Sequence, residues 1–195
     1  MTQIIIRYNK ILDEITKAHA LTLPKHAERA SQETDMNEVS KKIGQYIEAG
    51  TPIKEKVVEA IEKMAKRPFP YSVVNVNMVW IVHRTEAQAM IFPVSLSVDE
   101  FIILLTRELM HLSWPLYTAE FEEKYKNETP IVRDHIIIHA MLQHLWCDVL
   151  KRPDYLEMSK ARSDRHSTDD YTKAWEIVEK EGYMNVLNYI REPIK

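Results

Sequence analysis

Glycine is scarce in this chain, whose 195 residues include only three glycines, Gly44, Gly50 and Gly182. Average usage is roughly 7%. Phosphate-binding loops need clustered glycines, because backbone N–H groups must approach the ligand closely. The scattered glycines therefore exclude the Walker A loop, the dinucleotide-binding fingerprint, the glycine-rich kinase loop and the nucleophile elbow of serine hydrolases. They also count against an all-β sandwich or propeller, whose tight turns favour glycine.

Cysteine and long apolar runs are scarce as well. Cys147 is the only cysteine and lies in the apolar run 145–150, so an internal disulfide is excluded and a buried, inert thiol is predicted. No stretch approaches the roughly 20 apolar residues of a membrane-spanning helix. Residues 1–7 do not begin the long apolar segment of a secretory signal. We therefore expect a soluble, cytoplasmic protein that makes no contact with a membrane.

Neither sign of charge is in large excess. The 26 Lys and Arg residues against 29 Asp and Glu residues give a net charge of -3. This balance does not demand a nucleic-acid partner, and the basic residues of 151–166 lack the aromatic pattern of single-strand binding. Nucleic acid is therefore not an expected partner. The length fits one domain over 1–195, with N-terminal helices over 1–67, a core over 71–150 and C-terminal helices over 151–195.

Three helices are predicted before residue 67, because apolar residues recur there at helical spacing. The first spans residues 3–20, and residues 24–34 are expected to form a polar loop. The second begins at the capping box of Asp35 and Glu38 and ends at Gly50. Thr51 and Pro52 then begin the third, which ends before Pro68.

A change from helical to alternating spacing marks a small sheet. Residues 71–83 alternate, with Val74, Val76, Met78 and Trp80 on one face, and predict a half-buried strand. A polar turn over 84–86 and a second strand over 87–94 follow, which predicts an antiparallel pair. Because all strands lie in one block beside helices, the predicted class is α+β, predominantly helical, with a small antiparallel sheet packed against helices.

Further helices are expected after the sheet. The first opens with the capping box of Ser97 and Glu100 and is broken at Trp114-Pro115. The others are predicted at 117–126, 130–151, 168–181 and 183–191, with Gly182 between the last two and an irregular segment over 152–167.

Two of these helices bear side chains whose spacing suits chemistry. Glu108 and His111 are three residues apart and share one face of their helix. His135 and His139 are four residues apart on a later helix, a spacing that lets two imidazoles meet one metal ion. A di-iron bundle would need a second Glu-x-x-His motif, and the sequence contains only this one.

The run 101–112, with Arg107, Glu108 and His111, resembles the active-site helix of the zincin metallopeptidases. In that family a small sheet precedes a helix with H-E-x-x-H, and a following helix supplies a third zinc ligand, usually Glu in the gluzincin branch. The resemblance covers roughly residues 71–150, and strand 87–94 takes the place of the family's substrate-binding edge strand. It implies a zincin-like fold, bound zinc and peptide hydrolysis with Glu108 as the general base.

Arg107 departs from the family pattern, because it stands where zincins have their first zinc-binding histidine. Arginine stays protonated and offers no lone pair to a metal. The residues themselves suggest a different ligand set, His111, His135 and His139 with water at the fourth position. Arg107 would then stabilise an anionic intermediate, or, without a metal, pair with Glu108 or Asp134.

These observations leave two functions open. The first is a zincin-like protein with a degenerate metallopeptidase site, either a pseudo-enzyme or an atypical zinc-dependent hydrolase. The second is a non-enzymatic helical interaction module with core histidines and no metal, whose partner is another protein, a peptide or a second copy of the chain. A Cys-His enzyme built on Cys147 and His144 is disfavoured by their apolar surroundings.

Overall fold

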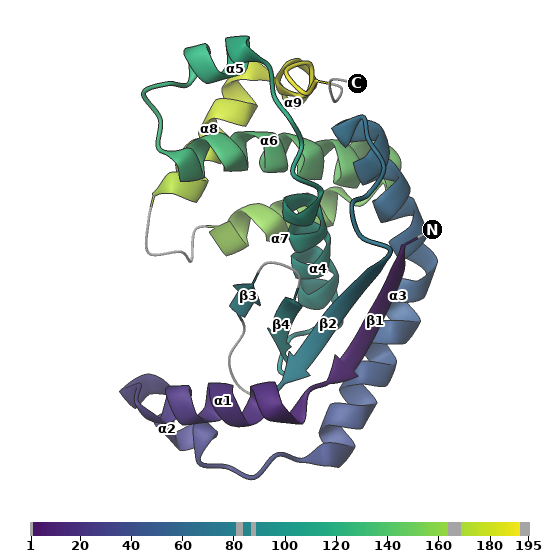
Figure 1. Ribbon diagram of the computed structural model, residues 1–195, viewed down its shortest axis with the longest axis vertical. Coiled ribbons are helices and arrows are strands. Elements are labelled where there is room, and N and C mark those ends of the chain that lie inside the picture. Colours follow the sequence, from purple (N-terminus) through teal and green to yellow (C-terminus); the bar gives the residue numbers. More distant parts are fainter. Residues whose placement is uncertain (1, 81–83, 87–88, 164–168, 192–195) are drawn as a thin grey trace. The chain divides into compact units, whose positions relative to one another are not determined.

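The computed structural model describes residues 2–80, 84–86, 89–163 and 169–191, and this part of the chain is mostly helical with one small sheet (Figure 1). The predicted α+β class is therefore confirmed. The chain forms two compact units. The sheet unit comprises Met1–Glu55 and Tyr71–Glu108, and the helical unit comprises Lys56–Pro70 and Leu109–Lys195.

Two helices, α3 (Met36–Ala65) and α4 (Val98–Ser113), continue from the sheet unit into the helical unit. The sheet unit further contains β1 (Gln3–Tyr8), α1 (Lys10–Leu21), α2 (Pro24–Ala30), β2 (Val73–Val79), β3 (Arg84–Glu86) and β4 (Ala89–Pro93). The helical unit further contains α5 (Ala119–Lys124), α6 (Pro130–His144), a π-helical turn (Leu145–Val149), α7 (Pro153–Ser163), α8 (Asp170–Glu181) and α9 (Tyr183–Leu187).

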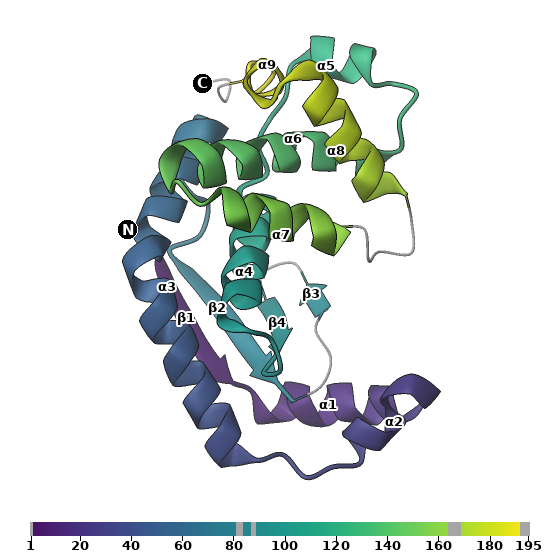
Figure 2. The same ribbon diagram turned by 180° about the vertical axis from the view of Figure 1, so that it is seen from behind.

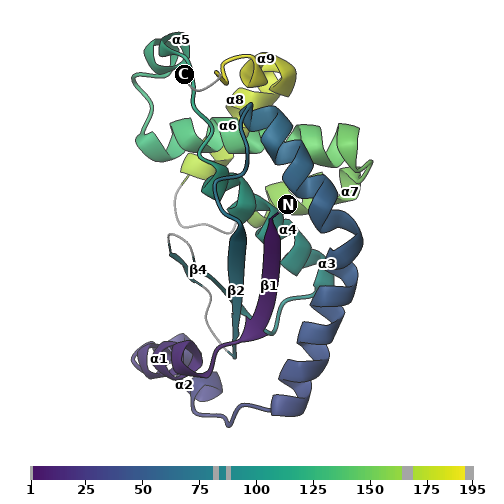
Figure 3. The same ribbon diagram turned by 45° about the vertical axis from the view of Figure 1, so that its right-hand side comes forward.

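The sheet has the strand order β1-β2-β4-β3. β2 pairs in parallel with both β1 and β4, and β3 pairs antiparallel with β4. Figure 3 shows β1 and β2 side by side. The prediction of an antiparallel sheet is therefore wrong. Residues 84–86, predicted as a turn, form β3, so the chain reverses twice and β4 runs in the direction of β2. Residues 81–83 and 87–88 of the two predicted strands lie outside the described residues.

The first predicted helix, 3–20, is also wrong over its first third. Ile4, Ile5 and Ile6 form β1 instead, because consecutive β-branched residues fit a pleated strand better than a helix. Asn9 then begins α1, where its side chain accepts a hydrogen bond from the N–H of Leu12 at 3.1 Å. The chain therefore starts as a strand and becomes a helix at a cap that the sequence already contains.

The core of the sheet unit forms where α3, α4 and β4 meet. Phe101 of α4 stacks on Tyr46 of α3 with ring centroids 4.3 Å apart and contacts Phe92 of β4 edge-on at 5.9 Å. The buried hydroxyl of Tyr46 donates toward the carbonyls of Val94 and Leu96. Figure 2 shows α4 lying across the sheet. Val74, Val76, Met78 and Trp80 are buried as predicted, but Asn77 and Val79 of the opposite face are buried as well, so the second half of β2 is not the half-buried strand that the alternation predicted.

α3 is one continuous helix, although Gly50 and Pro52 predicted two. The apolar positions stay in phase across the predicted break: Val39, Tyr46, Val57 and Ile61 are all buried. Spacings of 7, 11 and 4 residues return close to the same helical face, so burial outweighs the hydrogen bond that proline cannot make.

Other boundaries agree with the sequence only in part. The capping box is confirmed, because Ser97 and Glu100 exchange hydrogen bonds at the start of α4. Gly182 ends α8 with a φ of 82°, a conformation that favours glycine. Residues 24–30 and 153–163, predicted as loops, are helical, and the predicted helix 130–151 changes to a π-helical turn after His144. In the described ranges, no helix combines the length and apolar composition needed to span a bilayer.

Candidate functional site

α4 holds the three residues of the R-E-x-x-H motif. Ser97 and Glu100 cap its first turn, and its apolar residues bury it along most of its length. Arg107 is half-buried, Glu108 is buried at 8% exposure, and His111 is half-buried one turn beyond Glu108. The helix therefore places Glu108 and His111 on one face, as their spacing predicted.

α6 holds the other two predicted ligands. Thr129 accepts a hydrogen bond from the N–H of Val132 at 3.2 Å and caps the helix, which begins with Pro130. His135 and His139 are both buried. Nδ1 of His135 lies 2.8 Å from the carbonyl oxygen of Ile131. Because a carbonyl oxygen can only accept a hydrogen bond, Nδ1 is the donor. In the neutral imidazole the lone pair of His135 therefore lies on Nε2.

Aromatic rings link these histidines in the helical unit. The ring centroids of His111 and His135 are 4.9 Å apart, and those of His135 and His139 are 5.5 Å apart. His139 stacks on Trp175 of α8 at 4.0 Å, with ring planes only 8° apart. Tyr171 contacts His135 edge-on at 4.3 Å. The three predicted ligands thus belong to one ring cluster, in which two α8 aromatics pack against the histidines of α6.

The fit of this cluster to zinc depends on its donor groups. Arg107, in the first ligand position of the family motif, has no lone pair to offer. Among the residues that the structure describes, no group of three or more His, Cys, Asp or Glu side chains is placed to hold a metal ion. Zinc therefore stays a prediction from the sequence.

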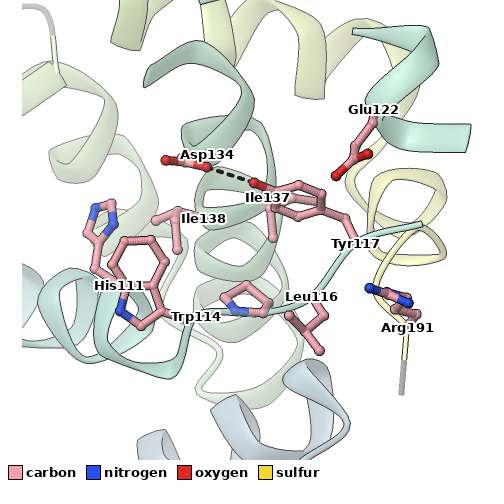
Figure 4. Close-up of a pocket in the computed structure, with 10 residues that line it drawn as sticks. His111, Trp114, Leu116, Tyr117, Glu122, Asp134, Ile137, Ile138 and Arg191 are labelled. Carbon is pink, nitrogen blue, oxygen red and sulfur yellow. Dashed lines mark hydrogen bonds between the residues drawn. The ribbon is translucent and has the colours of Figure 1, made fainter. Parts of the chain in front are cut away.

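A pocket of about 230 Å³ lies in the helical unit beside His111 (Figure 4). His111 is the one residue of the predicted site that lines it. The other lining residues come from the segment after α4 and from α5, α6 and the chain after α9: Trp114, Pro115, Leu116, Tyr117, Glu122, Asp134, Ile137, Ile138 and Arg191. The pocket therefore combines apolar walls with a few charged groups, as ligand sites commonly do.

The charged groups of the pocket have few partners. The hydroxyl of Tyr117 donates to Oδ1 of Asp134 at 3.0 Å. Burial, with the negative charge of Asp134, raises the pKa of Tyr117 to about 12, so Tyr117 remains a donor at neutral pH. Across the described ranges, Asp134, Glu122 and Arg191 form no ion pair with any side chain.

Trp114 stands at the edge of this pocket in an unusual conformation. Its side chain is 62% exposed, whereas Trp80, Trp146 and Trp175 are buried. Its φ is 43°, in the left-handed region that bulky residues rarely adopt. Such backbone strain often marks a functional site. Trp114 therefore adds an exposed aromatic surface to the pocket at a cost in local stability.

In the segment between α4 and α5, Tyr117 has a backbone edge, here called its open backbone edge, that makes no hydrogen bond to the described residues. Tyr117 forms an isolated antiparallel bridge with Ile190. The N–H of Thr118 donates to the carbonyl of Tyr189, and the N–H of Arg191 donates to that of Leu116, both at 2.9 Å. This pattern points the N–H and C=O of Tyr117 away from Ile190. Neither group is hydrogen-bonded to another residue in the part of the chain that the structure describes.

Sequence reasoning missed most of this pocket. In the sequence, Trp114 and Pro115 indicate only the end of a helix, and Tyr117, Glu122 and Arg191 have no motif spacing that singles them out. A large aromatic immediately after an apolar helix was the one available signal. The exposure of that aromatic depends on packing and is not readable from the sequence.

Cys147 is half-buried, not fully buried as predicted, and His144, three residues before it, is engaged by Asp148. Nδ1 of His144 bonds to Oδ2 of Asp148 at 2.8 Å, and the hydroxyl of Tyr183 donates to the same oxygen at 2.7 Å. Burial, with the nearby Asp148, raises the pKa of the Cys147 thiol, which disfavours the reactive thiolate.

Comparison of the chain with known protein families, curated proteins and solved structures finds no match.

Proposed function

We propose that this protein is a non-enzymatic interaction module that binds an extended peptide segment of a partner protein beside Tyr117. The open backbone edge of Tyr117, next to the pocket, is the observation that carries the proposal. An extended peptide can pair its own N–H and C=O groups with such an edge, while a neighbouring pocket receives one of its side chains.

Trp114 supports a binding role for the same surface. Exposed tryptophans are frequent binding hot spots, because they bury a large apolar area at little entropic cost. The left-handed backbone conformation of Trp114 is unfavourable for folding, and its exposed indole adds little stabilising packing to offset that cost. A ligand that covers this indole would explain why the strained position bears a tryptophan.

Selection of peptide ligands tests the proposal directly. A phage-displayed library of random linear peptides is selected against the full chain, and the dissociation constants of enriched peptides are measured by fluorescence anisotropy. Trp114→Ala should weaken binding by about tenfold or more. Met184→Ala is a matched control, because Met184 is similarly exposed but does not line the pocket.

Backbone methylation of an enriched peptide tests the pairing with Tyr117. Methyl groups on alternate peptide nitrogens should abolish binding in one register and leave it unchanged in the other, because only alternate N–H groups face the neighbouring strand. Equal binding by wild type and Trp114→Ala, together with indifference to methylation, would contradict the proposal.

The degenerate zincin-like site is a second candidate, as a pseudo-enzyme or an atypical hydrolase. It is favoured by the contact between the His111 and His135 rings, which brings side chains of α4 and α6 together. Calorimetric titration of metal-stripped protein with Zn²⁺ tests it. Stoichiometric binding that is lost in His135→Ala and kept in the control His144→Ala would favour this candidate. Absence of zinc binding would count against this candidate. If zinc binds, the Glu108→Ala variant then tests whether any peptidase activity depends on Glu108.

A further inference from the structure

We infer that the pocket beside Tyr117 selects a lysine or arginine side chain of the bound peptide. This inference rests on the proposed peptide-binding function and adds the chemical class of the anchoring residue.

The charges of the pocket favour a cation. Asp134 of α6 and Glu122 of α5 contribute two carboxylates, against one guanidinium from Arg191, so the lining is net negative when His111 is neutral. Figure 4 shows Arg191 and His111 at opposite ends of the lining, with Tyr117 and Asp134 between them. A cationic side chain would supply the counter-charge that neither carboxylate finds within the described residues.

Asp134 is set up to accept a further hydrogen bond. Its Oδ1 accepts from the hydroxyl of Tyr117, which fixes the orientation of the carboxylate. In the described part of the chain no side-chain donor is bonded to Oδ2. An ammonium or guanidinium group bound there would make a charge-assisted hydrogen bond, stronger than one between neutral groups.

The apolar walls suit the rest of a basic side chain. Lysine and arginine have apolar stems that pack along hydrophobic surface while the charged group remains at a polar site. Ile137 and Ile138 of α6 line the pocket beside Asp134 and would contact such a stem. The exposed indole of Trp114 offers an aromatic face that attracts cations. An acidic side chain would instead meet two carboxylates.

Four capped, valine-rich host peptides test the selectivity; they differ only in a central lysine, acetyl-lysine, norleucine or glutamate. Anisotropy titrations with the full chain should give affinities for the lysine peptide about tenfold higher than for the acetyl-lysine and norleucine peptides. The glutamate peptide should bind most weakly. Acetylation removes the charge without altering the protein, so this comparison does not depend on whether a variant folds.

Two protein variants should change the affinity for the lysine peptide in opposite directions. Asp134→Asn keeps an acceptor for Tyr117 but removes the charge, and should weaken binding of the lysine peptide about tenfold with little effect on the norleucine peptide. Arg191→Gln removes the repelling cation and should strengthen binding of the lysine peptide about twofold to threefold. Glu176→Gln is the control, since Glu176 is an exposed acid that does not line the pocket.

The outcomes separate the inference from the function on which it rests. If no host peptide binds, both the peptide-binding function and the selectivity are overturned. If all four bind with similar affinity, the function stands and the selectivity is overturned. If Arg191→Gln abolishes binding and Asp134→Asn strengthens it, the anchor is acidic and the inference is wrong.

Discussion

The carboxylate of Asp13 in α1 accepts a hydrogen bond from the backbone N–H of Trp80, 67 residues further along the chain. Its Oδ2 accepts hydrogen bonds from the hydroxyls of Tyr8 at 2.7 Å and Thr34 at 3.0 Å. Asp13 is only 2% exposed. A buried carboxylate is tolerated when donors satisfy both oxygens, so this side chain joins α1 to the ends of β1 and β2.

Asp13→Ala should destabilise the protein strongly, because the N–H of Trp80 and the hydroxyl of Tyr8 would lose their acceptor. We expect the free energy of unfolding to fall by about 3 kcal/mol, measured by urea denaturation. Glu14→Ala is the matched control on the same helix. Glu14 forms an exposed pair with Lys10 at 3.9 Å, so its loss should cost less than about 0.5 kcal/mol. Equal effects of the two substitutions would contradict this role of Asp13.

Tyr46 should make the protein less stable in alkali. Burial raises the pKa of Tyr46 to about 12, and the carboxylates of Glu100 and Glu38 add to the effect. Because the unfolded chain releases this proton near its ordinary pKa of about 10, the stabilisation is complete below pH 10 and is lost as pH rises toward 12. Tyr46→Phe should reduce the slope of unfolding free energy against pH in this window. An unchanged slope would show that other groups cause the loss.

Tyr183 should make stability depend on pH at the acid end. Its hydrogen bond lowers the pKa of Asp148, and His144 lowers it further. A carboxyl group whose pKa is lowered in the folded state stabilises the protein above its ordinary pKa of about 4, and this contribution is lost as pH falls through the folded pKa. Tyr183→Phe should therefore reduce the acid-side loss of stability in urea titrations. Tyr189→Phe is the control, because that hydroxyl contacts Lys124 instead.

Trp114→Gly should be more stable than Trp114→Ala by about 1 kcal/mol. Both substitutions remove the exposed indole, so they differ mainly in how readily the backbone adopts a φ of 43°. Glycine enters this region at little cost, whereas alanine retains the steric penalty of a Cβ atom. Thermal denaturation of the two variants measures the difference. If alanine is equally stable, the backbone at position 114 is not strained.

Local signals predicted where several helices begin and end. Ser97 and Glu100 cap α4, Thr129 caps α6, and Gly182 ends α8, each through contacts within a few residues. The same local reasoning failed at residues 3–8, where a helical spacing extends by chance into three consecutive isoleucines. Periodicity alone could not separate a short buried strand from a helix there.

The sequence likewise predicts only part of the candidate site. Spacing along α4 and α6 predicts that Glu108 and His111 share one helix face and that His135 and His139 share another. The packing of three helices decides two further contacts. His111 of α4 contacts His135 of α6, and His139 of α6 stacks on Trp175 of α8. The bond from Tyr117 to Asp134 and the open backbone edge at Tyr117 also lay beyond any local pattern.

The sequence by itself determined the predominantly helical α+β class, the capped helix ends and the absence of glycine-rich phosphate loops, because each depends on composition or on neighbours within one turn. Only the tertiary structure decided the parallel pairing of β1 with β2, the burial of Asp13 and the pocket between Trp114 and Arg191. These features join segments far apart in the chain. They arise when apolar faces are buried together and the buried polar groups must then find partners.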